Sequence, residues 1–499
     1  MSVPEYDFLI AGSGVSGMTM AMLLARGGAR VCMLEKSQRI GGSMQRFLRA
    51  GVPFDTGFHF TAGLGGVFGD MFEVLGCRET IPCVPVTNSF RIRGRNYVLP
   101  RGRQEIRNFL QSLFPSEAGA IQAFFEREKD IFDRTPLFRL SGGSGMENLF
   151  FPSSAEDQKT LTQTMDEFHF SRDLRLLLGG FAICCCGTPA TEISFESFAR
   201  INYGFYDDLV RFRHGGDDFI REFLRQRERY GIDLRTGTEI ASCVPSSADP
   251  KLCHEIVTTH GDTITFGNAV FSIHPHAIAE ILRPVTSNRS FFARTAEFEE
   301  TCGYFTLWAV LDDASEAELD EPAEICSFFG DTPLERLLEK GDEADGVLAV
   351  TEETASGKRV RTFTAFVSVL EDETAEWKAT SSGRRSASYA AYKEQKARKI
   401  LESLYRNRPE LEGRLTVVET ASQLTYRDYL SPYGSAYGIR QKAGQYNIFG
   451  RLPVRNFYAI GQNSMLPGAI GAMQSAFLLW PKLAGEETCR KVLDGRAAS

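Results

Sequence analysis

The first 35 residues place the strongest constraint on the fold. They contain two short apolar runs, DFLIAG and ARVCMLE, which flank a glycine-rich turn and a stretch rich in Ala, Leu and Met. Short apolar runs bounded by glycine are typical of buried parallel strands. The stretch between them ends in Gly27-Gly28, as helices commonly do. The order strand, glycine turn, helix, strand predicts a unit that binds a dinucleotide.

The turn matches the pattern GxGxxG, and each glycine has its own physical task. Gly12 permits the tight turn, Gly14 lets the backbone approach a pyrophosphate, and Gly17 lets the helix pack closely on the strand. Val15 and Ser16 then begin a helix whose unpaired N–H groups attract an anion. We therefore expect this turn to hold the phosphates of the dinucleotide.

The second strand ends in Glu35, where an acid can accept hydrogen bonds from adenosine ribose hydroxyls. The alternative interpretation is a glycine-rich turn in an ordinary βαβ unit that binds no nucleotide. It does not explain why the second strand ends in an acid. The next residues read KSQRIGGSM, and the pair Gly41-Gly42 resembles the glycine doublet of FAD-containing amine oxidases and carotene desaturases. That resemblance implies FAD as the cofactor, with Lys36 and Ser43 also beside it.

Composition narrows the choice of partners and compartment. The chain has 499 residues, which is too long for one ordinary core, and a net charge of −8, which argues against a nucleic-acid partner. Its 11 cysteines include the run Cys184–Cys186 and no CxxC pair, so we expect reduced thiols in the cytoplasm. A metal site would need paired cysteines or clustered histidines, and the sequence shows neither, so no metal site is predicted. With no long apolar stretch and no apparent room for a signal peptide, the chain is expected to attach at most to a membrane surface.

Near its C-terminus the chain repeats the strand, glycine turn and helix pattern. NFYAIG ends at Gly461, and a helix is expected to begin near Gly468. The segment resembles the second FAD motif of the same superfamily, with Gln462-Asn463 where most members carry an acid. The resemblance implies that the first and last segments of the chain hold one cofactor. The predicted contacts are Gly461, Asn463, Gly468, Ala469 and Ile470, with Val244 beside the adenine.

Two further stretches refine the resemblance. VPFDTGFHF follows the glycine doublet, and TYRDYLSPYGSAYG precedes the last strand without a clear helical or strand period. Together they resemble the retinol saturase and carotenoid isomerase branch of the phytoene desaturase-like flavoproteins. This implies that Asp55 and Gly57 lie beside the flavin, with Asp55 compensated by backbone N–H groups. It also implies that His59 points at the reactive edge, where a near-neutral pKa suits proton transfer. A structural role for both Asp55 and His59 stays open.

The late aromatic stretch supplies further candidates for the proton donor. Its tyrosines alternate with small residues, which favours a loop that lines a pocket. As a hypothesis, the donor is His59 or one of Tyr429, Tyr433 and Tyr437. Aromatic packing beneath a loop is an equally good interpretation.

The resemblance implies an α/β fold with a Rossmann-like FAD-binding domain of the amine-oxidase (GR2) type and an inserted α+β substrate domain. The predicted domains are 1–75, 200–290 and 417–499 for FAD, and 76–199 and 291–416 for the substrate. The implied activity is saturation, desaturation or isomerisation of an apolar polyene or isoprenoid lipid, by hydride transfer at flavin N5. An amine oxidase and a non-catalytic flavin- or lipid-binding protein are the alternatives. The electron partner is not predicted.

Two stretches are rich in Phe: AIQAFFEREKDIFDRTPLFRL and NLFFPSS. They could form a hydrophobic tunnel or a surface that enters lipid headgroups. Ordinary core packing is the favoured interpretation. The three adjacent cysteines are expected to be small apolar filler. A polar loop and a long solvated helix are predicted between residues 370 and 413.

Overall fold

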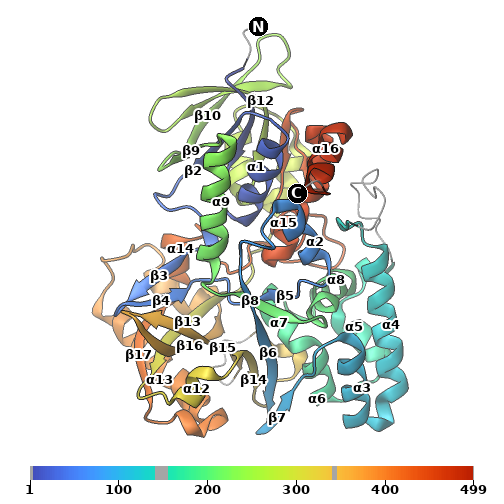
Figure 1. The fold of residues 1–499 in the computed structure, drawn as a ribbon, viewed down its shortest axis with the longest axis vertical. Helices are drawn as coiled ribbons and strands as arrows, with labels where there is room; N and C mark the ends of the chain where they lie inside the picture. The colour runs from blue at the N-terminus through green and yellow to red at the C-terminus, as the bar shows by residue number, and fades with distance from the viewer. Residues whose placement is uncertain (1–3, 141–154, 340–344, 498–499) are drawn as a thin grey trace.

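The computed structural model describes residues 4–140, 155–339 and 345–497. The N-terminal strand β1 lies inside an eight-stranded sheet, the upper one in Figure 1. It pairs in parallel with β2 on one side and β12 on the other, as the buried apolar runs predict. Strand β12 is long enough to pair with β11 at its start and with β19 at its end. The strands of this sheet are β1 (Tyr6–Ala11), β2 (Val31–Glu35), β9 (Asp233–Thr236), β10 (Ile240–Pro245), β11 (Cys253–Thr258), β12 (Thr263–Phe271), β18 (Gly450–Arg451) and β19 (Phe457–Ala459).

The first and last long helices of this region pack against each other on the sheet. Helix α1 and helix α15 are buried along nearly their whole length, which explains why neither sequence shows a polar face. Helix α9 has one apolar stripe and packs on α1 (Figure 1). The helices around this sheet are α1 (Val15–Arg26), α2 (Val67–Leu75), α9 (Gly216–Tyr230), α10 (Pro275–Leu282), α11 (Arg289–Ala296), α15 (Gly468–Ala484) and α16 (Glu486–Ala497).

A second, mostly antiparallel sheet of nine strands forms the lower part of the molecule, in the order β17-β13-β16-β15-β14-β6-β8-β5 with β7 beside β6. Strands β5, β8 and β17 belong to it, although they come from segments predicted to serve the FAD domain. A separate hairpin, β3 and β4, contacts β15. The bounds are β3 (Arg46–Arg49), β4 (Val52–Asp55), β5 (Thr61–Ala62), β6 (Cys83–Ile92), β7 (Arg95–Val98), β8 (Leu209–Phe212), β13 (Gly303–Leu311), β14 (Ala323–Phe329), β15 (Gly346–Ala355), β16 (Lys358–Val369) and β17 (Leu415–Ala421).

Helices cover the remaining sides of the second sheet. The Phe-rich stretch forms α4, whose Phe124, Phe125 and Phe132 are buried in the core shared with α8, so the core-packing interpretation is confirmed. The stretch NLFFPSS lies outside the described residues. The long polar helix is α13, and the predicted late loop begins with the short helix α14. These helices are α3 (Arg103–Leu113), α4 (Ala118–Arg134), α5 (Leu161–Glu167), α6 (Arg172–Arg175), α7 (Phe181–Cys186), α8 (Phe195–Phe205), α12 (Glu316–Asp320), α13 (Ala387–Asn407) and α14 (Gln423–Tyr429).

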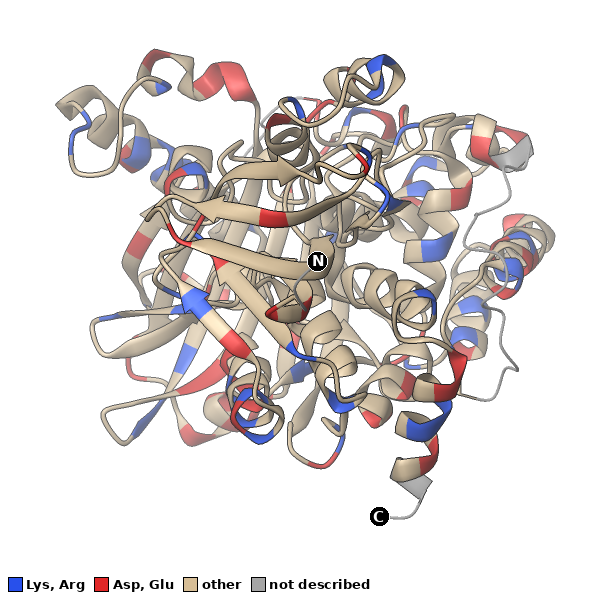
Figure 2. Cartoon of the chain, turned by 90° about the horizontal axis from the view of Figure 1, so that it is seen from above, with Lys and Arg blue, Asp and Glu red and all other residues tan. Residues whose placement is uncertain are grey.

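The surface carries both signs of charge in alternation, and Figure 2 shows acidic and basic residues interspersed over the outer helices and strands. Within the part of the chain that the structure describes, no helix has the length and apolar character needed to cross a bilayer. All 11 cysteines are free, and Cys184 and Cys186 are buried in the core as small apolar residues.

Candidate cofactor and substrate site

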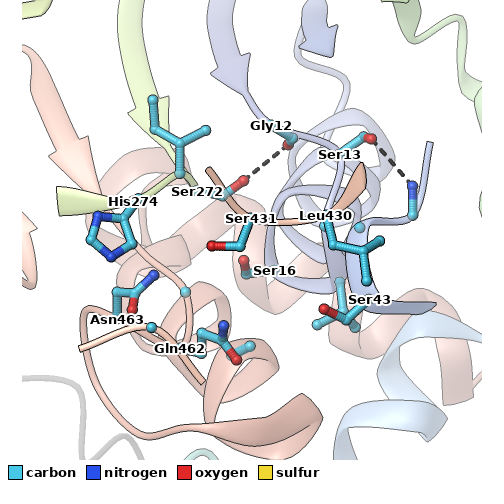
Figure 3. A pocket seen from close by; sticks show the side chains of 18 of the residues that line it. Gly12, Ser13, Ser16, Ser43, Ser272, His274, Leu430, Ser431, Gln462 and Asn463 are labelled. Atoms are coloured by element: carbon cyan, nitrogen blue, oxygen red, sulfur yellow. Dashed lines mark hydrogen bonds between the residues drawn. The ribbon is translucent and has the colours of Figure 1, made fainter. Parts of the chain in front are cut away.

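A cavity of about 530 Å³ lies between the two sheets. One wall consists of the glycine turns of the upper sheet, and the other of aromatic residues from the lower sheet and the late loop. Figure 3 shows the polar part of this cavity, where Ser13, Ser16, Ser272 and Asn463 come together from distant segments. The cavity is therefore built from both predicted domains.

The first glycine turn has the packing that its sequence predicts. The φ of Gly12 is +96°, and a Cβ on Gly17 would lie 2.1 Å from the Gly12 carbonyl oxygen. Ser272 Oγ donates to the same carbonyl oxygen at 2.9 Å (Figure 3). Gly17 therefore acts by letting α1 approach β1, and it is not among the residues that line the cavity.

Gly14 has a different environment. It precedes α1 in an extended conformation, and a Cβ added there would meet nothing within 4 Å. No side chain caps the N-terminus of α1, so its first N–H groups are free to meet an anion in the cavity. Val15 and Ser16 line the cavity at this point, as predicted.

The acid of the second strand closes the far side of the turn. Glu35 accepts hydrogen bonds from Ser13 N at 2.9 Å, Ser13 Oγ at 2.6 Å and Ser37 N at 2.9 Å. Its carboxylate is thereby fixed beside the cavity, which Lys36 also lines. The remaining lone pairs can accept from ribose hydroxyls.

The second glycine doublet stacks on the first turn. Gly41 N donates to the Ser13 carbonyl oxygen at 3.1 Å, and Gly41 and Gly42 both have positive φ. A Cβ on Gly42 would lie 3.4 Å from the Gly14 Cα. Ser43 and Gly57 extend this wall of the cavity.

The C-terminal turn meets the N-terminal one across the cavity. Gly461 has a φ of +110°, and a Cβ there would lie 3.2 Å from Ser16 Oγ. Helix α15 begins at Gly468 without a side-chain cap, and a Cβ on Gly468 would meet open space. Asn463 lines the cavity, and its Oδ1 accepts from the Ile439 N–H at 2.9 Å. Ala469 lines the cavity, whereas Ile470 does not.

These features fit FAD. Two uncapped helix N-termini face one cavity, and Gly14 and Gly468 leave space that any Cβ would occupy. A diphosphate requires backbone donors and close approach, and the cavity provides both.

The prediction for Asp55 is corrected. Asp55 does not line the cavity, and its carboxylate pairs with the guanidinium groups of Arg46 at 2.8 Å and Arg211 at 2.9 Å. Glu353 completes the buried group, at 2.6 Å from Arg46. Side chains from distant strands therefore compensate Asp55, where the sequence analysis expected backbone N–H groups.

The adenine-side prediction shifts by a few residues. Val244 is 37% exposed and outside the cavity, because its side chain lies on the solvent side of β10. The start of the same strand, Ile240 and Ala241, lines the cavity instead.

The opposite wall of the cavity is aromatic. His59 stacks on Phe366 with ring centroids 5.1 Å apart, and Tyr304 meets Phe366 edge-on at 5.8 Å. Tyr437 meets Tyr304 edge-on at 6.4 Å. Tyr304 and Phe366 were missed by the sequence analysis, because they lie on strands β13 and β16 where alternation alone predicts only burial.

The polar atoms on this wall differ in their partners. Tyr426 donates to the Thr56 carbonyl oxygen at 3.0 Å, and Tyr304 donates to the Cys184 carbonyl oxygen. Among the described residues, the Tyr437 hydroxyl and both ring nitrogens of His59 have no hydrogen-bond partner. These groups are free to meet a ligand.

Burial sets the protonation states on this wall. Burial lowers the pKa of His59 to about 4, although Asp55 raises it, so the ring is neutral at pH 7. The expected near-neutral pKa is therefore corrected. Burial also raises the pKa values of Tyr304, Tyr426 and Tyr437, which keeps their hydroxyls protonated.

Two of the predicted tyrosines lie away from the centre of the cavity. Tyr429 is at its rim, 63% exposed, with its hydroxyl 2.9 Å from Ser382 Oγ. Tyr433 is outside the lining and packs against His274, with ring centroids 4.1 Å apart and ring planes tilted by 35°. His274 itself lines the cavity and lies close to His276 and Glu300, so the expectation that histidines do not cluster is also corrected.

Comparison with known proteins agrees with this geometry. The family model for flavin containing amine oxidoreductases matches residues 15–302. An all-trans-retinol 13,14-reductase from Macaca fascicularis is 23% identical over 95% of this chain and 85% of its own length. Prolycopene isomerase 1 from an Oncidium hybrid cultivar is 33% identical over 26% of this chain and 23% of its own length. The structure of cyclohexylamine oxidase from Brevibacterium oxydans is similar with a TM-score of 0.63 and 15% identity, covering 98% of this chain and 99% of that one.

The resemblance to retinol saturases, carotenoid isomerases and phytoene desaturases is confirmed, and so are the amine-oxidase type of fold and the FAD cofactor. Two glycine turns from opposite ends of the sequence, both uncapped and both open to one cavity, are the structural basis of that cofactor assignment. The chain belongs to the family of flavin containing amine oxidoreductases and is an FAD-dependent oxidoreductase.

Proposed function

We propose that this enzyme reduces a carbon–carbon double bond of an apolar polyene or isoprenoid lipid. The observation that carries the proposal is the aromatic wall opposite the glycine turns, which consists of His59, Tyr304, Phe366, Tyr426 and Tyr437. Bound FAD supplies hydride-transfer chemistry to the site. The chain itself must then bind an apolar substrate and provide one proton.

The charge distribution in the cavity supports an uncharged substrate. Among the described residues that line the cavity, the charged ones are Glu35, Lys36, Glu239 and Glu280, which come from the strands of the upper sheet, the turns beside them or helix α10. The described residues of the aromatic wall are all neutral at pH 7, since His59 has a pKa of about 4. An ammonium group would meet no carboxylate among the described residues of this wall, so its desolvation would not be compensated. A polyene carries no charge whose hydration must be given up.

The proton is assigned to Tyr437, with His59 as the second donor. The Tyr437 hydroxyl is protonated and free of partners, while Tyr304 and Tyr426 donate to backbone carbonyls. A neutral imidazole also carries one N–H that can donate. The relative from Macaca fascicularis is named as a reductase of all-trans-retinol, which supports the same reaction direction.

The reaction is tested on the purified, flavin-loaded protein. Its flavin is reduced anaerobically with light, and all-trans-retinol or a linear carotenoid is added in deuterated water. We expect reoxidation of the flavin and a product that is two hydrogens richer, with one solvent deuterium on carbon. Lipid extracted from the untreated protein, analysed by mass spectrometry, identifies the natural ligand class.

The alternatives give different results in the same assays. An amine oxidase would be reduced by a primary amine under argon and release peroxide in air. A non-catalytic carrier would bind polyene without reoxidation of its flavin. Either result would overturn the proposed reaction but leave the FAD assignment intact.

A further inference from the structure

A cluster of potential metal ligands lies at the edge of the cavity. His274 and His276 flank Pro275 at the start of α10, and Glu300 comes from the segment just before β13. The ligand atoms of the three side chains all lie within 4.8 Å of one another. His274 lines the same cavity as the glycine turns, but none of the three side chains belongs to a glycine turn.

The hydrogen bonds of His276 define which nitrogen is free. Its Nε2 donates to the Thr295 carbonyl oxygen at 2.9 Å, because a carbonyl can only accept. In the neutral ring, Nδ1 then carries a lone pair, and it faces Glu300 Oε1 at 3.6 Å. A backbone carbonyl that orients the second nitrogen is the arrangement that metal-binding histidines usually have.

Glu300 presents an oxygen that is short of donors. Its Oε2 accepts from Ser435 Oγ at 2.6 Å and from His274 Nε2 at 3.2 Å, whereas Oε1 is buried and makes no well-directed hydrogen bond. That oxygen lies 3.0 Å from His274 Nε2. Glu300 Oε1 and His276 Nδ1 are both electron-rich and lie 3.6 Å apart beside the His274 Nε2–H group, and a cation that replaced this proton would stabilise both.

The spacing matches a tetrahedral ion. Ligand bonds of about 2.0–2.1 Å to zinc place neighbouring ligand atoms roughly 3.3 Å apart. The two measured separations, 3.0 and 3.6 Å, bracket that value. His276 and Glu300 keep about a quarter of their side-chain surface exposed, at 27% and 24%, which leaves room for a water as fourth ligand.

The surroundings hold the ligands in place at a modest cost. Tyr433 packs against the His274 ring, with ring centroids 4.1 Å apart and ring planes tilted by 35°. His274 Nδ1 lies 3.3 Å from the His276 N–H. Ligation through Nε2 moves the ring proton to Nδ1 and gives up both this long contact and the hydrogen bond from Nε2 to Glu300 Oε2, so the metal–ligand bonds must exceed both losses.

We propose that His274, His276 and Glu300 bind one divalent transition-metal ion, with zinc as the best match. The ion would connect α10 of the FAD region to the segment before β13, whose Glu300 accepts a hydrogen bond from Ser435. None of the three ligands belongs to a glycine turn, so we expect FAD to stay bound when the metal is removed, although His274 lines the same cavity.

The test uses the flavin-loaded, full-length protein freed of metals by a chelator. Equilibrium dialysis against zinc, followed by metal analysis, is expected to give one ion per chain. Glu300→Gln and His276→Ala should each weaken binding by at least about 100-fold, since each removes a ligand. His260→Ala is the matched control, because His260 is an exposed histidine outside the cluster, and its affinity should equal that of the wild type.

X-ray absorption at the zinc edge of the wild-type protein gives a readout that does not depend on any variant. We expect two imidazole nitrogens and carboxylate or water oxygen at about 2.0–2.1 Å. Any of three results would overturn the proposal: the protein fails to retain zinc, the wild type and the cluster variants bind zinc with equal affinity, or the spectrum shows sulfur ligands or oxygen alone.

Discussion

Tyr437 provides the sharpest test of proton supply at the scale of single residues. Tyr437→Phe removes a tyrosine hydroxyl of the aromatic wall that has no hydrogen-bond partner among the described residues, and it keeps the ring contact with Tyr304. We expect the rate of polyene reduction to fall about 100-fold, the lower range for loss of a general acid, with substrate affinity nearly unchanged. Single-turnover kinetics with pre-reduced enzyme measure both quantities.

Tyr429→Phe is the matched control for that substitution. Its hydroxyl contacts Ser382 at the exposed rim, so the rate should stay at the wild-type value. An unchanged rate in Tyr437→Phe would remove Tyr437 from the mechanism and leave His59 as the donor.

His59 makes the stability of the protein depend on pH in a defined direction. Its pKa is about 4 in the fold, below the ordinary 6.5, because burial disfavours the charged ring. Between these two values the unfolded chain binds a proton that the folded chain does not, so stability falls as the pH is lowered through this window. Above pH 6.5 the ring is neutral in both the folded and the unfolded chain, and this loss of stability disappears.

We therefore expect His59→Gln to be less sensitive to acid than the wild type. The melting temperature of each protein is measured at about pH 7 and about pH 5. The decrease on acidification should be smaller in the variant. Equal decreases in both proteins would show that His59 does not titrate with a lowered pKa.

At the scale of elements, two glycines of the first turn separate folding from cofactor binding. Gly17→Ala would place a Cβ 2.1 Å from the Gly12 carbonyl oxygen, so α1 and β1 must move apart and stability should fall. Gly14→Ala meets no protein atom within 4 Å and needs no unusual φ, so the protein should stay folded. Its methyl group would instead occupy the diphosphate cradle.

Thermal unfolding and FAD titration of the apoprotein measure the two effects. Gly14→Ala should bind FAD at least about 10-fold more weakly with a nearly unchanged apoprotein melting temperature. Gly17→Ala should lower that temperature. If both variants lost stability equally, the separate tasks of the two glycines would be wrong.

The same elements show what a sequence can predict. The turns at Gly12 and Gly461 were predicted because strand, turn and helix follow one another within a few residues, and local geometry fixes their chemistry. The buried group around Asp55 was not predicted, since Arg211 and Glu353 come from other strands far along the chain. Burial by such distant groups also lowered the pKa of His59, which no local pattern indicates.

At the scale of the whole molecule, four buried charges connect the hairpin β3–β4 to the second sheet. Arg46 and Asp55 come from the hairpin, Arg211 from β8 and Glu353 from β15. Arg211 contacts Asp55 at 2.9 Å and Glu353 at 3.1 Å, and Arg46 contacts the same two carboxylates. The group is neutral as a whole, so removal of any one charge leaves an uncompensated charge in a buried site.

Adjacent residues on β15 allow this connection to be tested within a single strand. Glu353 lies in the buried group with its side chain 4% exposed, whereas Glu352 pairs with Arg359 at the surface with 38% exposed. Glu353→Gln should lower the free energy of unfolding by about 3–5 kcal/mol, and Glu352→Gln by less than about 1 kcal/mol. Denaturant unfolding of both flavin-loaded variants gives the comparison. Both substitutions remove one negative charge from the same strand, so a difference between them reports burial rather than net charge. Similar losses in the two variants would mean that water reaches the four-charge group, and the hairpin that leads to His59 would then be held by other contacts.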